Sequence, residues 1–188
     1  ALGTVEPRKD LPTLVRAFDL VAGEQPDLHL VVAGPPGWGM ADYERAVAAA
    51  SHRSRIVRLG YVSGDDRAAL LASATVFAYP SLYEGFGLPP LEAMLAGVPV
   101  VTTDAGALPE VVGDAAEVVG VGDAEGLARA LAAVISDEGR RGALIDRGRA
   151  RTREFSWERS AEGLVGLYRD AAEDRTTTAE HRRRRPRS

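Results

Sequence analysis

The sequence contains no cysteine, and Lys9 is the only lysine among its 23 basic residues. Without cysteine the chain can form no disulfide, no thiolate metal site and no thiol nucleophile. The three histidines are scattered and lack the spacing of metal ligands, so a zinc enzyme is not expected. No apolar run approaches the roughly 20 residues that a helix needs to span a bilayer. We therefore expect neither a cofactor, nor a metal, nor a membrane-spanning helix.

The length of 188 residues, with 45% hydrophobic and 27% charged residues, is typical of one soluble globular domain. The chain begins without methionine on a segment that resembles the end of a strand, so we expect further residues upstream of Ala1. The net charge of −4 is uneven, because residues 175–188 carry six arginines and one glutamate, which leaves −9 for the rest. An acidic body is not typical of a nucleic-acid-binding surface.

The basic tail allows two interpretations. We expect residues 175–188 to be disordered and solvated in a cytoplasmic protein. The open alternative is peripheral contact with anionic lipid at the inner face of the membrane.

Short apolar segments alternate with helical patterns along most of the chain. Most of the apolar segments are solid runs, typical of parallel strands that are covered on both faces. The predicted strands are 2–5, 28–33, 56–59, 76–79, 98–102 and 117–119, and the predicted helices are 11–22, 42–50, 66–72, 91–95 and 126–135. This alternation predicts an α/β fold, a Rossmann-like, doubly wound parallel sheet of about six strands in one domain over 1–174. The chain after Ser136 is helical in pattern, and Ser156 is predicted to cap a last helix ending near Ala172.

Ligands of open parallel sheets bind at the carboxyl ends of the strands, where the first loop of this chain has unusual chemistry. Gly3 lets the backbone approach a ligand closely. The planar fork of Arg8 and the compact charge of Lys9 together suit a diphosphate. The alternative is that both are solvated loop cations. A second loop at 33–37 lacks the G-x-G-x-x-G spacing of dinucleotide-binding folds.

The loop after the strand at 76–79 is more informative. Gly85 and Gly87 flank Phe86 and free the backbone to present successive N–H groups. Pro89 and Pro90 fix the first turn of the next helix, where their missing N–H groups cost little. The partial positive charge at this helix N-terminus favours a phosphate.

Two glutamates, Glu84 and Glu92, bracket this loop. A glycosidase pair would lie about 5–5.5 Å or 6.5–9.5 Å apart, and the prolines leave that separation open, but a hydrolase is not favoured. We expect Glu84 to accept sugar hydroxyls and Glu92 ribose hydroxyls, with the phosphates between them, because each carboxylate oxygen can accept one O–H. The structural alternative is that Glu84 caps the loop and Glu92 is a surface residue.

The pattern E-G-F-G-L at 84–88, continued to Glu92, resembles the signature of retaining, GT-B-fold glycosyltransferases of family GT4. The resemblance spans residues 1–168 and is closest to mannosyltransferase-like members. Further matching motifs are G-T-V-E-P-R-K-D-L at 3–11, L-G-Y-V at 59–62, G-V-P-V-V at 97–101, L-P-E-V-V at 108–112 and F-S-W at 155–157.

The resemblance implies a C-terminal domain that binds a nucleotide-diphosphate sugar, with an N-terminal acceptor-binding domain absent from this chain. Arg8 and Lys9 would bind the diphosphate, and Thr4 stands where many members carry an arginine, so Arg8 is expected to supply that charge. Glu84 would contact the transferred sugar and Glu92 the ribose. Other donor contacts would come from the backbone of Phe86, Gly87 and Leu88 and from the loop at Tyr61 and Val62.

The expected reaction is a metal-independent glycosyl transfer that retains the anomeric configuration, with the isolated chain weakly active or inactive. The donor nucleotide, UDP, GDP or ADP, remains open. The alternatives are a non-catalytic nucleotide-sugar-binding or regulatory domain, half of a split enzyme, an epimerase, or a phosphorylase. A phosphorylase needs a pyridoxal lysine deep in the domain, whereas Lys9 lies in the first loop.

Overall fold

The computed structural model describes the backbone of residues 1–183 and the side chains of residues 1–171. The chain divides into two compact units, Ala1–Thr152 and a second unit that begins at Arg153, whereas the sequence predicts one domain over 1–174. Within the described part, no helix is both long enough and apolar enough to cross a membrane.

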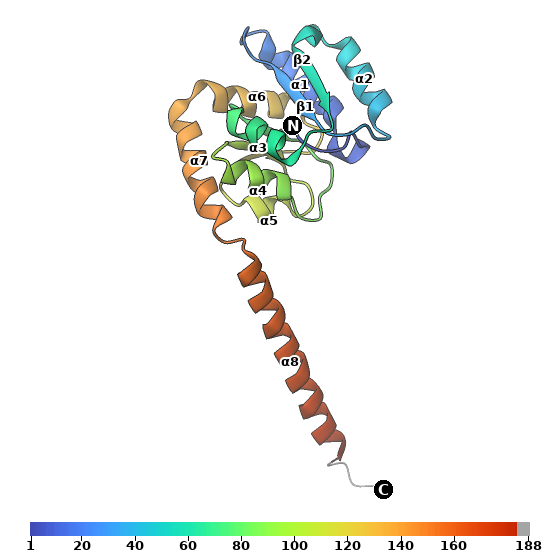
Figure 1. The fold of residues 1–188 in the computed structure, drawn as a ribbon, viewed down its shortest axis with the longest axis vertical. Helices are drawn as coiled ribbons and strands as arrows, with labels where there is room; N and C mark the ends of the chain where they lie inside the picture. The colour runs from blue at the N-terminus through green and yellow to red at the C-terminus, as the bar shows by residue number, and fades with distance from the viewer. Residues whose placement is uncertain (184–188) are drawn as a thin grey trace. The chain divides into compact units, whose positions relative to one another are not determined.

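Five parallel strands form two small sheets in the first unit (Figure 1). One sheet pairs β1 (Leu30–Ala33) with β2 (Ile56–Gly60), and the other has the order β3 (Phe77–Tyr79), β4 (Val100–Thr103), β5 (Ala116–Val119). The predicted α/β class with parallel strands is confirmed. The predicted single sheet of about six strands is wrong, because the described residues contain five strands in two sheets.

The missing sixth strand is the one predicted at 2–5. Leu2 makes only an isolated parallel bridge to Ala33, supported by the N–H of Ala33 donating to the Ala1 carbonyl at 3.0 Å and that of Gly3 to the Ala33 carbonyl at 2.9 Å. Gly3 then adopts φ +135°, a conformation that side chains rarely allow, and the chain turns toward the loop after β1. The strand is thus shortened to one bridge at the edge of β1.

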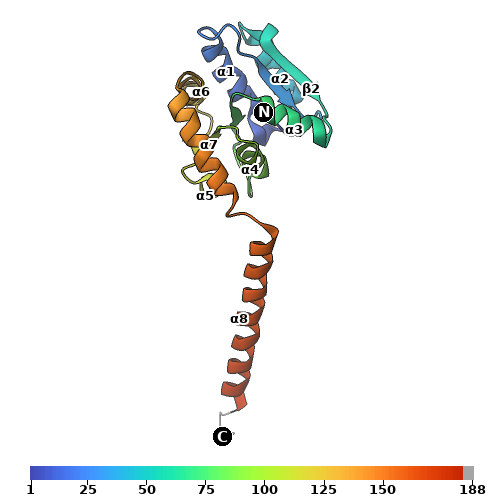
Figure 2. The same cartoon turned by 60° about the vertical axis from the view of Figure 1, so that its left-hand side comes forward.

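Seven helices of the first unit surround these strands (Figure 2). The prediction over 11–22 matches α1 from end to end, and the other predicted helices shift by a few residues. The short helix α5 was not predicted. The helices are α1 (Leu11–Ala22), α2 (Met40–Ala49), α3 (Gly64–Ser73), α4 (Leu88–Leu95), α5 (Leu108–Val112), α6 (Ala124–Ser136) and α7 (Glu138–Thr152), with 3-10 turns η1 (Pro7–Lys9) and η2 (Arg53–Arg55).

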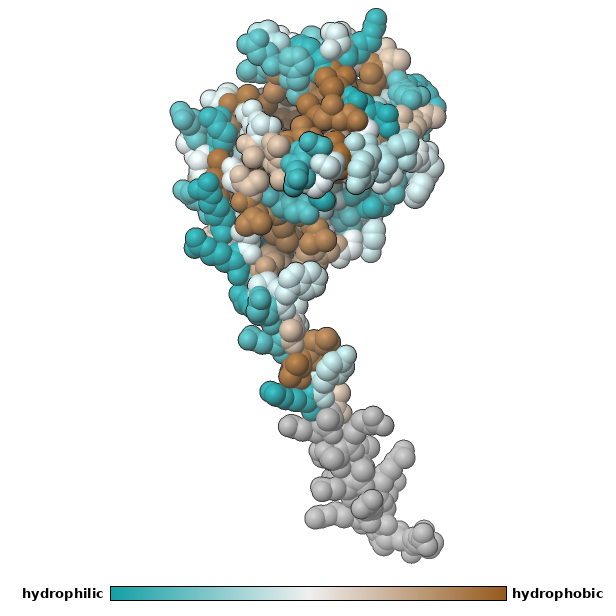
Figure 3. All heavy atoms as spheres, viewed as in Figure 1, coloured by the Kyte–Doolittle hydropathy of each residue, from teal (hydrophilic) through white to brown (hydrophobic). Residues whose placement is uncertain are grey.

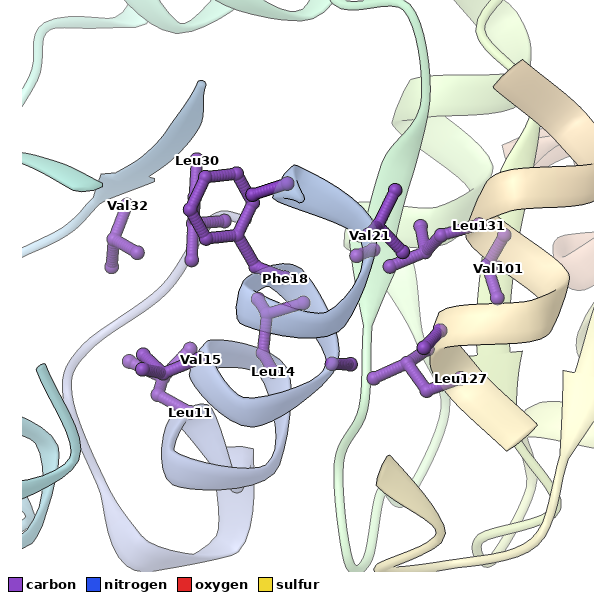
Figure 4. Close-up of a cluster of buried hydrophobic side chains, with 14 of the residues drawn as sticks. Leu11, Leu14, Val15, Phe18, Val21, Leu30, Val32, Val101, Leu127 and Leu131 are labelled. Carbon is purple, nitrogen blue, oxygen red and sulfur yellow. The ribbon is translucent and has the colours of Figure 1, made fainter. Parts of the chain in front are cut away.

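The core holds α1 against α6 (Figure 4). Leu14, Phe18 and Val21 lie on one face of α1 and are buried with Leu127 and Leu131 of α6. Burying each such side chain stabilises the fold by about 1.5–3 kcal/mol. Because η1 immediately precedes α1, this core also fixes the position of the loop that carries the two basic residues.

The second unit contains α8 (Trp157–Arg183). The predicted cap is confirmed, since the backbone N–H of Arg159 donates to Ser156 Oγ at 3.2 Å, and the helix continues past the expected end near Ala172. Trp157, Leu167 and Tyr168 are exposed, and apolar surface is visible on this helix in Figure 3. The disorder expected over residues 175–188 is not what the structure records for 175–183, whose backbone belongs to α8. Residues 184–188 lie outside the described residues, so for them the expectation stays a prediction.

Candidate functional site

The first loop and the loop after β3 meet at the carboxyl ends of the strands. The N–H of Leu82 donates to the Arg8 carbonyl at 2.7 Å and ties the loops together. The N–H of Gly34 donates to the Gly60 carbonyl at 2.7 Å, so the loops after β1 and β2 also meet there. A Cβ on Gly34 would lie 1.9 Å from the Gly3 carbonyl oxygen, which requires glycine at this approach. The loops therefore converge at the edge of the fold where the sequence predicts a ligand.

Four side chains donate to one oxygen of Glu84. Its Oε1 accepts from Arg8 Nη1 at 2.8 Å, Lys9 Nζ at 2.6 Å, Tyr79 Oη at 2.9 Å and Ser81 Oγ at 2.8 Å. We call these five residues the Glu84 cluster. The structure records no hydrogen bond from a described protein group to Oε2. Glu84 is thus held through one of its two oxygens.

Lys9 is the buried cation of the Glu84 cluster. It is 8% exposed and Glu84 is 9% exposed. The Lys9 ammonium lies 4.4 Å from the centroid of the Tyr79 ring and also contacts the Tyr79 hydroxyl. A buried charge is costly unless it is paired and hydrogen-bonded, and both conditions hold here.

The charges at this site are already balanced. Arg8 pairs with Glu84 and, through Nε at 2.8 Å, with Glu6. Two cations, Arg8 and Lys9, therefore meet two carboxylates, and the side chain of Arg8 is the more exposed cation at 45%. An incoming diphosphate would have to compete with Glu6 for the guanidinium.

The protonation of the Glu84 cluster follows from its hydrogen bonds. Burial alone would raise the pKa of Glu84, but hydrogen bonds from Lys9, Ser81 and Tyr79 and the charge of Lys9 bring it below its usual range. Burial lowers the pKa of Lys9, and Glu84 offsets only part of that effect. Burial and the Glu84 charge raise the pKa of Tyr79. Glu84 is therefore a carboxylate near neutral pH, unlike the acid of a glycosidase, whose pKa is raised.

Glu92 has different surroundings. It lies in the second turn of α4 and pairs with Arg67 of α3, and both side chains are 39% exposed. It shares no recorded partner with Glu84. The two acids are therefore held separately, with the N-terminus of α4 between them in the chain.

The turn between the two acids depends on its second glycine. Gly87 adopts φ +118°, and a Cβ there would lie 2.8 Å from Leu108 Cδ2. Gly85 has no atom near a would-be Cβ, and Phe86 is 44% exposed. No side chain caps α4, which begins at Leu88. No described side chain therefore satisfies the free backbone N–H groups of this first turn, to which Pro89 and Pro90 contribute none.

The remaining predicted residues lie at the same edge with fewer contacts. A Cβ on Gly3 would lie 3.3 Å from Lys9 Cε, so this glycine gives room to the buried lysine. Tyr61 is 80% exposed and Val62 is half-buried in the loop after β2. The structure does not test their predicted contact with the base.

The sequence prediction missed four residues that shape the site. Tyr79 and Ser81 stand within the loop that the sequence singled out, but their convergence on one oxygen depends on the fold. Gly106 lies against the backbone of Glu84, where a Cβ would come within 2.4 Å of the Glu84 carbonyl oxygen, and Arg67 pairs with Glu92.

A cavity of about 320 Å³ lies elsewhere in the first unit. Its lining is largely apolar and includes Leu14, Phe18, Leu71 and Phe77. None of the predicted site residues lines it. Among the described residues, no group of three or more His, Asp or Glu side chains is placed to hold a metal ion.

Comparison with known proteins agrees with these observations. The O-antigen chain mannosyltransferase B of Escherichia coli is 38% identical over 169 residues, which cover 89% of this chain and 44% of that protein. The MMP alpha-(1->4)-mannosyltransferase of Mycolicibacterium hassiacum is 45% identical over 114 residues, covering 58% of this chain and 28% of that protein. The chain spans less than half of the length of these curated relatives.

Solved structures show the same fold. The C-terminal domain of a glycosyl transferase group 1 family protein (LpcC) from Francisella tularensis superposes with a TM-score of 0.73 at 25% identity, covering 81% of this chain and 83% of that one. Anabaena HepE, solved with UDP and glucose, has a TM-score of 0.73 at 23% identity and covers 93% of this chain and 47% of that one. The family described as glycosyl transferases group 1 matches residues 1–151. Motifs, fold and this match together show that the chain belongs to the group 1 glycosyltransferases, family GT4, as a C-terminal domain of the GT-B fold.

Proposed function

We propose that this domain binds the nucleotide-diphosphate sugar donor of a retaining, metal-independent glycosyltransferase whose transferred sugar is a hexose such as mannose. The observation that carries the proposal is the convergence of Arg8 and Lys9 on Glu84 beside the uncapped N-terminus of α4. Cations and a helix N-terminus together suit a pyrophosphate. The names of the mannosyltransferase relatives support the choice of sugar.

The Glu84 cluster supports a specific division of roles. As the bond between the sugar and the diphosphate breaks, the leaving group gains negative charge, and each preorganised positive group lowers the barrier by a few kcal/mol. Arg8 and Lys9 would supply that charge. Because Oε1 of Glu84 already accepts four hydrogen bonds, we narrow its expected contact to one sugar hydroxyl on Oε2 rather than a diol on both oxygens.

The loops on either side would complete the donor site. The backbone of Gly85, Phe86, Gly87 and Leu88 would hold the sugar and the nearer phosphate, Glu92 the ribose, and the loop at Tyr61 and Val62 the base. Acceptor binding is assigned to a part of the enzyme outside this chain, since the relatives are more than twice as long.

The test is a binding panel of UDP-, GDP- and ADP-linked sugars, measured by thermal shift and calorimetry on the 188-residue chain. A ligand at about 100 times its Kd stabilises the folded state by about 2.7 kcal/mol. Arg8→Ala should weaken binding of the preferred donor. Arg45→Ala is the matched control, because Arg45 is also exposed and paired, with Asp42 on α2, away from the site.

Two outcomes would contradict the proposal. Absence of binding by any donor in the panel would remove the donor-binding role. Donor binding without sugar transfer by a longer protein that includes the upstream half would favour the alternative of a non-catalytic or regulatory domain.

A further inference from the structure

Arg67 joins two segments of the proposed donor site, although none of the sequence motifs assigns it a role. Its guanidinium donates to Oε2 of Glu92 across a separation of 25 residues. Arg67 lies in the first turns of α3, which begins directly after the loop at Tyr61 and Val62. Glu92 lies in the second turn of α4. The ion pair therefore connects the loop proposed for the base with the carboxylate proposed for the ribose.

Folding gains little from this ion pair. Both side chains are 39% exposed, and ion pairs with such exposure contribute little to stability. The start of α3 is stabilised independently, because Ser63 Oγ accepts from the N–H of Asp66 at 3.1 Å. The main effect of the ion pair is instead to fix the position of the Glu92 carboxylate.

The pairing leaves half of that carboxylate available. A guanidinium is permanently charged, planar and able only to donate. Arg67 engages Oε2, and the described residues make no other side-chain hydrogen bond to Glu92. Oε1 can therefore accept hydroxyl donors while the other oxygen stays fixed. Restricting the side chain before binding also reduces the entropy lost when a ligand binds.

We propose that Arg67 is a positioning residue that holds Glu92 so that Oε1 accepts a ribose hydroxyl of the donor nucleotide. The inference rests on the proposed function, since it assigns a partner to a residue of the same site. Arg67 contacts the carboxylate and not the ligand. In the competing arrangement, Arg67 and the ribose would compete for the Glu92 carboxylate, so that Arg67 would weaken ribose binding. The test below distinguishes the two arrangements.

The test compares ribonucleotides with analogues that lack the hydroxyls. Calorimetry on the 188-residue chain measures the affinities for UDP, GDP and ADP and for their 2′,3′-dideoxy counterparts. Arg67→Ala should weaken the preferred ribonucleotide about tenfold, roughly one decade of Kd, and leave its dideoxy counterpart unchanged. Arg67→Lys should restore part of the loss. Arg140→Ala, which breaks an exposed pair with Glu117 on other elements, should change neither affinity.

The Glu92→Gln background separates the possible failures. There the ribose preference should be lost, and adding Arg67→Ala should have no further effect. Two results would overturn the inference and leave donor binding intact. Arg67→Ala could lower the affinities for the ribonucleotide and its dideoxy counterpart equally, or the variant could bind the ribonucleotide more tightly than the parent chain does. If the parent bound none of the nucleotides, the proposed function itself would fail.

Discussion

Two glutamates separated by seven residues have opposite surroundings in this domain. Glu84 is buried and accepts four hydrogen bonds on one oxygen, whereas Glu92 is about two-fifths exposed and pairs with a single arginine. The first is held by side chains from η1 and from the end of β3, and the second by one partly exposed arginine. Residue type and spacing thus do not determine how rigidly an acid is held, and the difference favours different roles, with Glu84 near the reacting sugar and Glu92 at the nucleotide.

The largest expected effect is the difference between the two glutamates in how much their removal destabilises the fold. Glu84→Ala should lower the free energy of unfolding by about 3–5 kcal/mol, because Lys9 would keep its buried charge without a carboxylate. Glu92→Ala is the matched control and should cost less than about 1 kcal/mol, as expected for an exposed pair. Urea unfolding of both variants measures the difference. Equal losses would show that the Glu84 cluster is no more tightly coupled to the fold than the exposed pair.

The dependence of stability on pH is a second check on whether the ionised carboxylate of Glu84 stabilises the fold. The pKa of Glu84 is lower in the folded chain than in an unfolded one, so its stabilising contribution is present above the ordinary glutamate pKa of about 4.3 and is lost as pH falls through the folded value. The stability advantage of the parent over Glu84→Gln should therefore shrink as the solution is acidified below about pH 4.3. An advantage that stayed constant would mean that the carboxylate charge is not what stabilises the cluster.

The second comparison is between two buried tyrosines. Tyr79→Phe removes a donor to Glu84 and should cost about 1–2 kcal/mol of unfolding free energy, since hydrogen bonds to charged groups are stronger than neutral ones. Tyr43 is also buried, but none of the side-chain hydrogen bonds recorded among the described residues involves its hydroxyl, so Tyr43→Phe should be close to neutral. The two variants are compared by urea unfolding. A similar cost for both would assign the effect to packing rather than to the Glu84 cluster.

The sequence patterns predicted the helices and strands better than they predicted the contacts between side chains. The amphipathic repeat of α1 gave its bounds from Leu11 to Ala22, because the apolar residues that carry the repeat, at positions 11, 14, 15, 18 and 21, are all buried. The strand expected at 2–5 failed because its composition does not reveal the left-handed backbone of Gly3. The motifs brought Arg8, Lys9 and Glu84 into one site, as the structure also does.

The side-chain contacts within the site could not be predicted from the sequence. Lys9 and Glu84 are separated by 75 residues, so their contact depends on how the strands are placed and not on spacing. The motifs presented Arg8 and Lys9 as cations available to a diphosphate, and they could not show that Glu6 and Glu84 already balance them. The same holds for the pairing of Arg67 with Glu92.

The smallest expected effect concerns the charge balance of Arg8 and Lys9 with Glu6 and Glu84, in which Glu92 takes no part. Glu6→Gln keeps the shape of the side chain but removes the charge that competes for Arg8, so the preferred nucleotide-sugar donor should bind a few-fold tighter, by roughly 0.5–1 kcal/mol. Glu24→Gln makes the same charge change at an exposed position away from the site and serves as the control. Calorimetry at low and high salt measures both, and the gain should be smaller at high salt because exposed charges are screened. Weaker donor binding by Glu6→Gln would mean that Glu6 orients Arg8 for the phosphates rather than competing with them.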